Sequence, residues 1–345
     1  MFEKGIEAYL LLNGSDRRYF SGINTSFGCV IITPKDKVFV TDSRYTKYAN
    51  SVLDKDWQVV EVAGDNFFDQ IAIVFNRLGV TKVGFDESVT TLMRYDNLKK
   101  VLKDVTLVKC SKDLIKKRSI KSEGEIDKIT KAQRIAEKAL DKALKTVKPG
   151  IKERELKAEI IHAALVSGAE SMAFETIVAF GANSAFPHHT AGDKKLKKGD
   201  AILIDFGVKH EGYCSDMTRT FFLSEVNPRM EAIYNVVLKA LEYATKHISA
   251  GMTCREADSL AREYIKANGY GDNFEHSLGH GIGLDIHEHP KVSMSSDTVL
   301  EENMVITIEP GIYVQGLGGV RIEDLVIIKK DKCQVITQYT KKFKL

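Results

Sequence analysis

The sequence has 345 residues, 43% of them hydrophobic, and its 50 Lys plus Arg nearly balance 47 Asp plus Glu. This length suits two globular domains, and the near balance of charge excludes the strongly basic surface of a nucleic-acid-binding protein. No stretch approaches the roughly 20 apolar residues that span a bilayer, and the first residues lack a signal-peptide pattern, so no membrane partner is expected. The five cysteines are scattered, which argues against a disulfide framework or a thiolate zinc site and fits a reducing cytoplasm.

The first part of the chain has the pattern of a small α/β domain. Short β-rich runs alternate with polar turns, at Tyr9–Leu12, Cys29–Ile32 and Val38–Val40, and Phe67–Leu78 has helical spacing. A basic stretch, Lys116–Lys121, follows and is interpreted as a solvated linker. We therefore predict that a first domain ends at residue 118.

Residues 119–345 are predicted to form a second, larger domain. Ser122 with Glu125 is a capping box that opens a helix, and Thr253 with Glu256 is another. Between and after the helices lie four strand-like runs: Ala201–Ile204, Thr220–Leu223, Val305–Ile308 and Leu325–Ile328. This layout predicts an α+β domain in which helices pack on a curved, mostly antiparallel sheet.

Two aspartates are expected to lie side by side in this second domain. Asp205 ends an apolar strand in the motif IDFG, and the chain then turns and returns through YCSD to Asp216. A hairpin of this length brings both carboxylates together, and their repulsion calls for a raised pKa or a bound cation. A structural role for the pair alone stays equally open at this point.

Three further motifs change that balance. His280 lies in the glycine-rich HSLGHGIG, while Glu309 in IEPG and Glu323 in VRIED end or interrupt buried strands. A glutamate in a buried strand is costly unless it is paired or metal-bound. One histidine and four carboxylates form an oxygen-rich set that favours Mn²⁺ or Co²⁺, with Zn²⁺ as an alternative. Two such ions about 3.5–4 Å apart turn a water between them into a hydroxide nucleophile.

These five motifs, in this order, resemble the pita-bread metallopeptidase superfamily, which includes methionine aminopeptidases, aminopeptidase P, prolidase and the metal-free creatinase. DRRYFSG at Asp16–Gly22 and TDSRY at Thr41–Tyr45 resemble the creatinase-type N-terminal domain. The resemblance therefore covers nearly the whole chain. It implies a pita-bread domain at 119–345 after a creatinase-type α/β domain at 1–118, whose first helix looks truncated because Met1 lies close to the first strand.

The resemblance also implies a role for each ligand. Asp216 and Glu323 would bridge two divalent metal ions, Asp205 would complete one site, and His280 with Glu309 would complete the other. Glu309 would also be the general base that takes a proton from the attacking water.

Further site residues follow from the same resemblance. His188 would contact the substrate, His287 would stabilise the tetrahedral oxyanion, and His276 would be an accessory histidine of the pocket. Tyr313 and Arg321 would hold the ligating carboxylates in place.

Four residues near these motifs have less specific interpretations. His189 and His289 are interpreted as surface or supporting residues. Phe174 either lines a proline pocket or belongs to the core. Lys291 is a candidate for binding the free carboxylate of a dipeptide, although a solvated surface lysine is an equal alternative.

Arg321 and the N-terminal domain place the chain in the proline-specific branch of the superfamily. The resemblance thus implies a peptidase that hydrolyses the bond between an N-terminal residue and a following proline, in Xaa-Pro dipeptides and short Xaa-Pro peptides. It further implies a peptide substrate and a homodimer. A methionine aminopeptidase-like enzyme and a non-catalytic binding protein of the same fold remain the alternatives.

Overall fold

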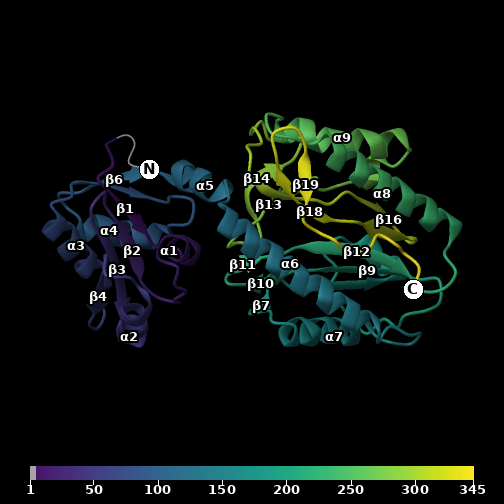
Figure 1. The fold of residues 1–345 in the computed structure, drawn as a ribbon, viewed down its shortest axis with the longest axis horizontal. Coiled ribbons are helices and arrows are strands. Elements are labelled where there is room, and N and C mark those ends of the chain that lie inside the picture. Colours follow the sequence, from purple (N-terminus) through teal and green to yellow (C-terminus); the bar gives the residue numbers. More distant parts are fainter. Residues whose placement is uncertain (1–4) are drawn as a thin grey trace. The chain divides into compact units, whose positions relative to one another are not determined.

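The computed structural model describes residues 5–345, and the chain forms two compact units, Met1–Arg118 and Ser119–Leu345. Figure 1 shows the ribbon of each unit. The expectation of a truncated first helix concerns the start of the chain, where residues 1–4 lie outside the described ones.

The first unit is built on one six-stranded mixed sheet, in the order β4-β3-β2-β1-β5-β6. Its strands are β1 (Ala8–Leu11), β2 (Cys29–Ile32), β3 (Lys37–Asp42), β4 (Trp57–Val62), β5 (Lys82–Phe85) and β6 (Thr106–Lys109). Its helices are α1 (Gly14–Ser21), α2 (Ser43–Val52), α3 (Phe67–Leu78), α4 (Leu92–Val101) and α5 (Ser111–Ser119). The small α/β domain is thus confirmed.

Both faces of this sheet are buried. Successive side chains of a strand point to opposite faces. Accordingly Leu10 packs into one apolar cluster with Phe75, whereas Tyr9 and Leu11 pack into a second cluster with Phe39. This explains why the strands are apolar runs rather than alternating ones.

The second unit combines four long helices with antiparallel strands. The helices are α6 (Glu123–Leu144), α7 (Glu153–Val166), α8 (Pro228–His247) and α9 (Cys254–Ala267), with short 3₁₀ turns η1 (Gly181–Ala185) and η2 (Gly271–Asn273). The strands of its first half are β7 (Ser171–Met172), β8 (Ile177–Phe180), β9 (Ala201–Phe206), β10 (Val208–His210), β11 (Tyr213–Cys214) and β12 (Met217–Phe222). Those of its second half are β13 (Gly279–Gly281), β14 (Glu288–Val292), β15 (Val305–Ile308), β16 (Gly311–Val314), β17 (Gly318–Arg321), β18 (Asp324–Ile328) and β19 (Cys333–Val335).

Two apolar cores flank the strands of this unit. Helices α6 and α7 pack with β8, β9 and β10 in one core, which contains Leu140, Leu156 and Phe206. Helices α8 and α9 pack with β15, β17 and β18 in the other, which contains Val237, Ile265 and Ile306. The two helix pairs therefore cover the strands from opposite sides (Figure 1), and the predicted α+β pita-bread domain is confirmed.

Local sequence signals mark where the helices begin, and they are less reliable for the strands. Ser122 and Glu125 form the predicted capping box of α6, and Thr253 and Glu256 form that of α9. The strand predicted at Thr220–Leu223 instead begins at Met217. It starts earlier because its pairing with β9 continues to Thr218 opposite Asp205 and Met217 opposite Phe206. The polar residues before Thr220 gave no sign of this pairing in the sequence.

The interpretation of Lys116–Lys121 as a solvated linker holds for the exposed side chains of Lys116 and Lys117 and is wrong for the rest of the stretch. Helix α5 continues to Ser119, and the Lys121 side chain is only 1% exposed, because its ammonium group pairs with Glu288. Among the helices of residues 5–345, none is long and apolar enough to cross a membrane.

Candidate metal centre

The β9–β12 hairpin brings the two predicted aspartates to one buried point. Asp205 lies near the end of β9 and Asp216 directly precedes β12, and both are less than 10% exposed. Arg321 Nη2 donates to Asp205 Oδ2 at 2.6 Å. Within residues 5–345, the Oδ1 atoms of Asp205 and Asp216 have no hydrogen-bond partner. Each aspartate thus keeps one buried oxygen for another ligand.

The glycines around His280 are explained by close packing of strand β13. A Cβ on Gly279 would lie 2.0 Å from the Thr307 carbonyl oxygen, and a Cβ on Gly281 would lie 2.3 Å from that of His289. A side chain at either position would therefore push β13 away from its neighbours. The motif GHG lets the strand lie close enough to place His280 among the carboxylates.

The hydrogen bond of its other ring nitrogen orients His280. Its Nδ1 lies 3.0 Å from the Gly281 carbonyl, so Nδ1 carries the proton and donates it. Its Nε2 lies 3.5 Å from Asp216 Oδ2 and 3.5 Å from Glu309 Oε1. Burial lowers the pKa of His280 to about 4, which keeps the ring neutral and Nε2 available as a ligand.

Two threonines hold the glutamates. Glu309 directly follows β15 and accepts a hydrogen bond from Thr307 Oγ1 at 3.1 Å. Glu323 lies between β17 and β18 and accepts one from Thr218 Oγ1 at 2.8 Å. Neither hydroxyl group is predictable from the sequence, because a threonine in a buried strand is also an ordinary β-former.

The carboxylates destabilise one another when all of them are charged. Burial, together with neighbouring Glu323 and Asp205, raises the pKa of Asp216 well above its usual value. Burial also raises the pKa of Glu323 well above its usual value and that of Glu309 to about 8. Ligand atoms of Asp216, His280 and Glu323 all lie within 4.8 Å of one another. The donor set and its orphaned oxygens therefore fit divalent cations.

Arg321 connects Asp205, one of the candidate metal ligands, to the cavity wall. Its Nε donates to Thr218 Oγ1 at 3.1 Å, and its Nη1 donates to the Tyr313 hydroxyl at 2.6 Å. Tyr313 in turn lies 2.9 Å from His276 Nε2, while His276 Nδ1 lies 2.9 Å from the Ser277 carbonyl. Nδ1 of His276 therefore carries the proton, and Nε2 accepts from Tyr313. Burial lowers the pKa of His276 to about 3, which agrees with a neutral ring.

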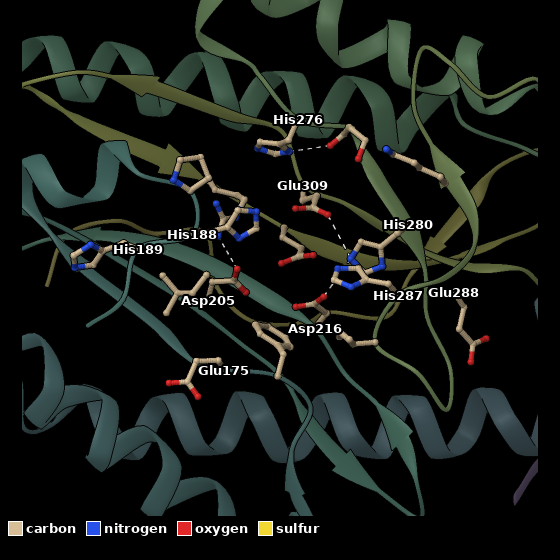
Figure 2. Close-up of a pocket in the computed structure, with 18 of the residues that line it drawn as sticks. Glu175, His188, His189, Asp205, Asp216, His276, His280, His287, Glu288 and Glu309 are labelled. Carbon is tan, nitrogen blue, oxygen red and sulfur yellow. Dashed lines mark hydrogen bonds and ion pairs between the residues drawn. The ribbon is translucent and has the colours of Figure 1, made fainter. Parts of the chain in front are cut away.

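A cavity of about 620 Å³ opens over these groups. His188 and His287 lie in its wall and are exposed, and the His287 ring lies 4.4 Å from that of His280 (Figure 2). Phe174 and Ile286 give the wall an apolar part. Nine of the ten predicted site residues line this one cavity, and Tyr313 contacts it through Arg321 and His276. The nine are His188, Asp205, Asp216, His276, His280, His287, Glu309, Arg321 and Glu323.

Sequence profiles of known families match both units. The creatinase/prolidase N-terminal domain matches residues 1–120, and metallopeptidase family M24 matches residues 127–330. The chain belongs to metallopeptidase family M24. A Xaa-Pro dipeptidase of Pyrococcus furiosus is 39% identical over 343 residues, covering 98% of this chain and 95% of that protein.

Solved structures agree with the M24 assignment. An X-Pro aminopeptidase from Thermotoga maritima has a TM-score of 0.93 at 38% identity, over 99% of this chain and 98% of that one. A Xaa-Pro dipeptidase from Bacillus anthracis has a TM-score of 0.94 at 40% identity, over 99% and 96%. The resemblance drawn from the five motifs is thus confirmed.

Proposed function

We propose that this M24 peptidase hydrolyses the bond between an N-terminal residue and a following proline, in Xaa-Pro dipeptides and short Xaa-Pro peptides. The observation that carries the proposal is the convergence of four buried carboxylates and His280 at the base of a partly apolar cavity. The similar proteins named above as Xaa-Pro dipeptidase or X-Pro aminopeptidase support the choice of substrate.

The proposed metal centre uses all five of these residues. Asp216 and Glu323 would be shared by two divalent ions, to which Asp205 on one side and His280 with Glu309 on the other would also bind. The oxygen-rich donors favour Mn²⁺, with Co²⁺ or Zn²⁺ as alternatives. When bound, the ions supply Lewis acidity and lower the pKa of water.

Side chains of the protein accept protons, contact the substrate and hold one another in place. Glu309 accepts the proton of the attacking water, and Thr307 fixes its carboxylate for that task. His188 and His287 face the cavity, where their N–H groups reach the scissile carbonyl and its developing negative charge. Arg321 donates a hydrogen bond to Asp205 and holds it in one orientation. Tyr313 accepts a hydrogen bond from Arg321 and donates one to His276, so it orients the His276 ring.

The apolar wall of the cavity can bind a proline ring without a hydrogen bond from the substrate's amide N–H. An Xaa-Pro bond has no N–H on its nitrogen and carries a rigid ring, so a peptidase that grips the N–H handles it poorly. The wall formed by Phe174 and Ile286 offers the ring a surface free of such a demand.

Lys291 is proposed to bind the free carboxylate of a dipeptide. It lies on β14 opposite His280 and lines the same cavity, exposed to solvent. A lysine is a mobile point charge, so we expect it to favour dipeptides only modestly.

We also propose that the protein is a homodimer in the cytoplasm. The family resemblance supports the homodimer, and the five buried cysteines without a disulfide within the described residues support a reducing compartment.

A substrate panel tests the proposal. Purified protein supplied with Mn²⁺, Co²⁺ or Zn²⁺ is assayed on Leu-Pro, Ala-Pro-Ala, Leu-Ala, Met-Pro and Met-Ala-Ser. We expect hydrolysis of the proline substrates at least tenfold faster than of the others. Comparable rates on Met-Ala-Ser and Met-Pro would instead support a methionine aminopeptidase, and metal binding without any hydrolysis would support a binding protein.

A further inference from the structure

The two exposed histidines of the cavity share one structural feature. His188 and His287 lie on loop segments, whereas the metal-type ligands lie on or beside strands. Each is followed by a residue whose side chain is anchored by a buried partner. Figure 2 shows these following residues, His189 and Glu288, extending away from Asp216 and Glu309.

The partner of His189 is Glu153, the first residue of α7, whose side chain is 0% exposed. One carboxylate oxygen of Glu153 accepts from the Phe180 N–H and from Asn183 Nδ2, both at 2.9 Å. The other lies 2.9 Å from His189 Nε2 and accepts from the Gly192 N–H at 3.0 Å. Although burial would raise the pKa of Glu153, these donors hold it below its usual value.

Glu153 therefore ties together both ends of the segment 180–192, which contains His188. The same segment is fixed from its other side by β17. The Gly319 N–H donates to Ser184 Oγ at 2.8 Å, and a Cβ on Gly319 would lie 2.2 Å from the Ser184 carbonyl oxygen. The backbone on which His188 lies is thus held between a helix terminus and a strand.

The partner of Glu288 is Lys121, and their charged groups lie 2.7 Å apart with side chains 7% and 1% exposed. The other oxygen of Glu288 accepts from the Asp285 N–H at 3.1 Å. Lys121 is itself fixed, because its backbone N–H donates to the Asn303 carbonyl at 2.9 Å. One carboxylate thus closes the turn 285–288, in which His287 lies.

We propose that Glu153 and Lys121 are positioning residues, which act on the reaction through His188 and His287 respectively. The proposal rests on the proposed function, because that function gives the two histidines their work on the scissile carbonyl. A misplacement of about 1 Å can cost up to about 100-fold in rate, so a loop histidine needs such an anchor.

Double-mutant cycles test the proposal on the metal-supplied full-length protein with Leu-Pro. We expect Glu153→Gln to lower kcat about tenfold in the wild type but less than about twofold in the His188→Ala background. In the His287→Ala background it should keep its full effect. Lys121→Met should show the reverse pattern. Equal losses in every background would overturn the proposal and show a general loss of stability.

Conservative variants keep the test informative where a buried charge is left unpaired. Lys121→Arg preserves the ion pair, and His189→Gln preserves a donor to Glu153, so both should stay within about twofold of wild-type kcat. His189→Ala should resemble Glu153→Gln. A loss in His189→Gln as large as in His189→Ala would count against the anchor.

The matched control is Glu137→Gln, outside the cavity. Glu137 is 9% exposed, pairs with Arg134 and accepts from the Gln338 N–H at 2.6 Å. Its replacement should lower the unfolding temperature and leave kcat within about twofold, in every histidine background.

A second readout does not depend on activity. In histidine-labelled, chelator-treated protein, the NMR signals of His188 and His287 are assigned from their alanine variants. Glu153→Gln should shift the His188 signal, together with that of its direct partner His189, and leave the His287 signal in place. Lys121→Met should shift the His287 signal and leave the His188 signal in place. If the alanine variants left kcat unchanged, the proposed function would be wrong, whereas unshifted signals would reject the anchoring itself.

Discussion

The buried carboxylates of the metal centre give the metal-free protein a stability that should fall as the pH rises. The pKa of Glu309 is raised from 4.5 to about 8, and those of Asp216 and Glu323 are also raised. Above pH 6.5 the unfolded chain has released the Glu309 proton, while the folded chain still holds it up to about pH 8. The folded state then binds more protons, so its stability decreases with increasing pH.

The magnitude follows from the same linkage. Each proton held only by the folded state changes the free energy of unfolding by about 1.4 kcal/mol per pH unit. Glu309 alone therefore lowers it by roughly 2 kcal/mol between pH 6.5 and 8. His276 and His280, with pKa values lowered to about 3 and 4, act in the opposite direction, and because an unfolded histidine is still half protonated at pH 6.5 each one adds about 0.4 kcal/mol of stability between pH 6.5 and 8. A comparison with Glu309→Gln, in which these histidines are retained, therefore isolates the contribution of the Glu309 carboxyl group.

Urea unfolding of chelator-treated protein at pH 6.5 and pH 8 measures this effect. Far-UV circular dichroism follows the whole chain, and Trp57, the single tryptophan, lies in β4 and reports on the first unit. We expect the fall between pH 6.5 and 8 to be roughly 2 kcal/mol larger in the metal-free wild type than in metal-free Glu309→Gln. Saturating Mn²⁺ should remove the fall in the wild type, because cations replace the protons. The same dependence on pH in both metal-free proteins would contradict the link between stability and the Glu309 proton.

Two further predictions concern individual residues of the cavity. His287→Ala should bind metal as the wild type does yet lose about 100-fold in kcat, because its proposed work is in the transition state; parallel metal analysis and steady-state kinetics check this, and a loss of metal would contradict it. Lys291→Ala should shift the ratio of Leu-Pro to Leu-Pro-Ala hydrolysis toward the tripeptide, by about threefold to tenfold in kcat/KM. An unchanged ratio would remove Lys291 from carboxylate binding.

Most residues of the candidate metal centre stand out in the sequence because they break a local rule. An aspartate or glutamate at the end of a buried strand is costly, and Asp205, Glu309 and Glu323 all show this pattern in the sequence. The start of helix α6 was also predictable, because its capping residues Ser122 and Glu125 lie within one helical turn of each other in the sequence. The fold of both units followed from such signals and from the family resemblance.

The supporting residues were not predictable, because their partners are far away in the sequence. Lys121 was taken for a solvated lysine, and its burial is decided by Glu288, 167 positions later. Glu153 looks like an ordinary first-turn glutamate of a helix, and its partner His189 is 36 positions away. Thr218 gave no signal, since its contact with Glu323 depends on how β12 meets the end of β17. Contacts of this kind are set by tertiary packing rather than by local pattern.

We propose that the four carboxylates and His280 hold two metal ions on which Xaa-Pro hydrolysis depends. A titration of chelator-treated protein with Mn²⁺, in which bound metal and the rate of Leu-Pro hydrolysis are measured together, tests this directly, with Asp216→Asn as the matched control. The wild-type rate should rise until two ions are bound per chain, and Asp216→Asn should bind fewer ions and stay inactive. Full activity in the chelator-treated wild type, or in Asp216→Asn, would contradict the proposal.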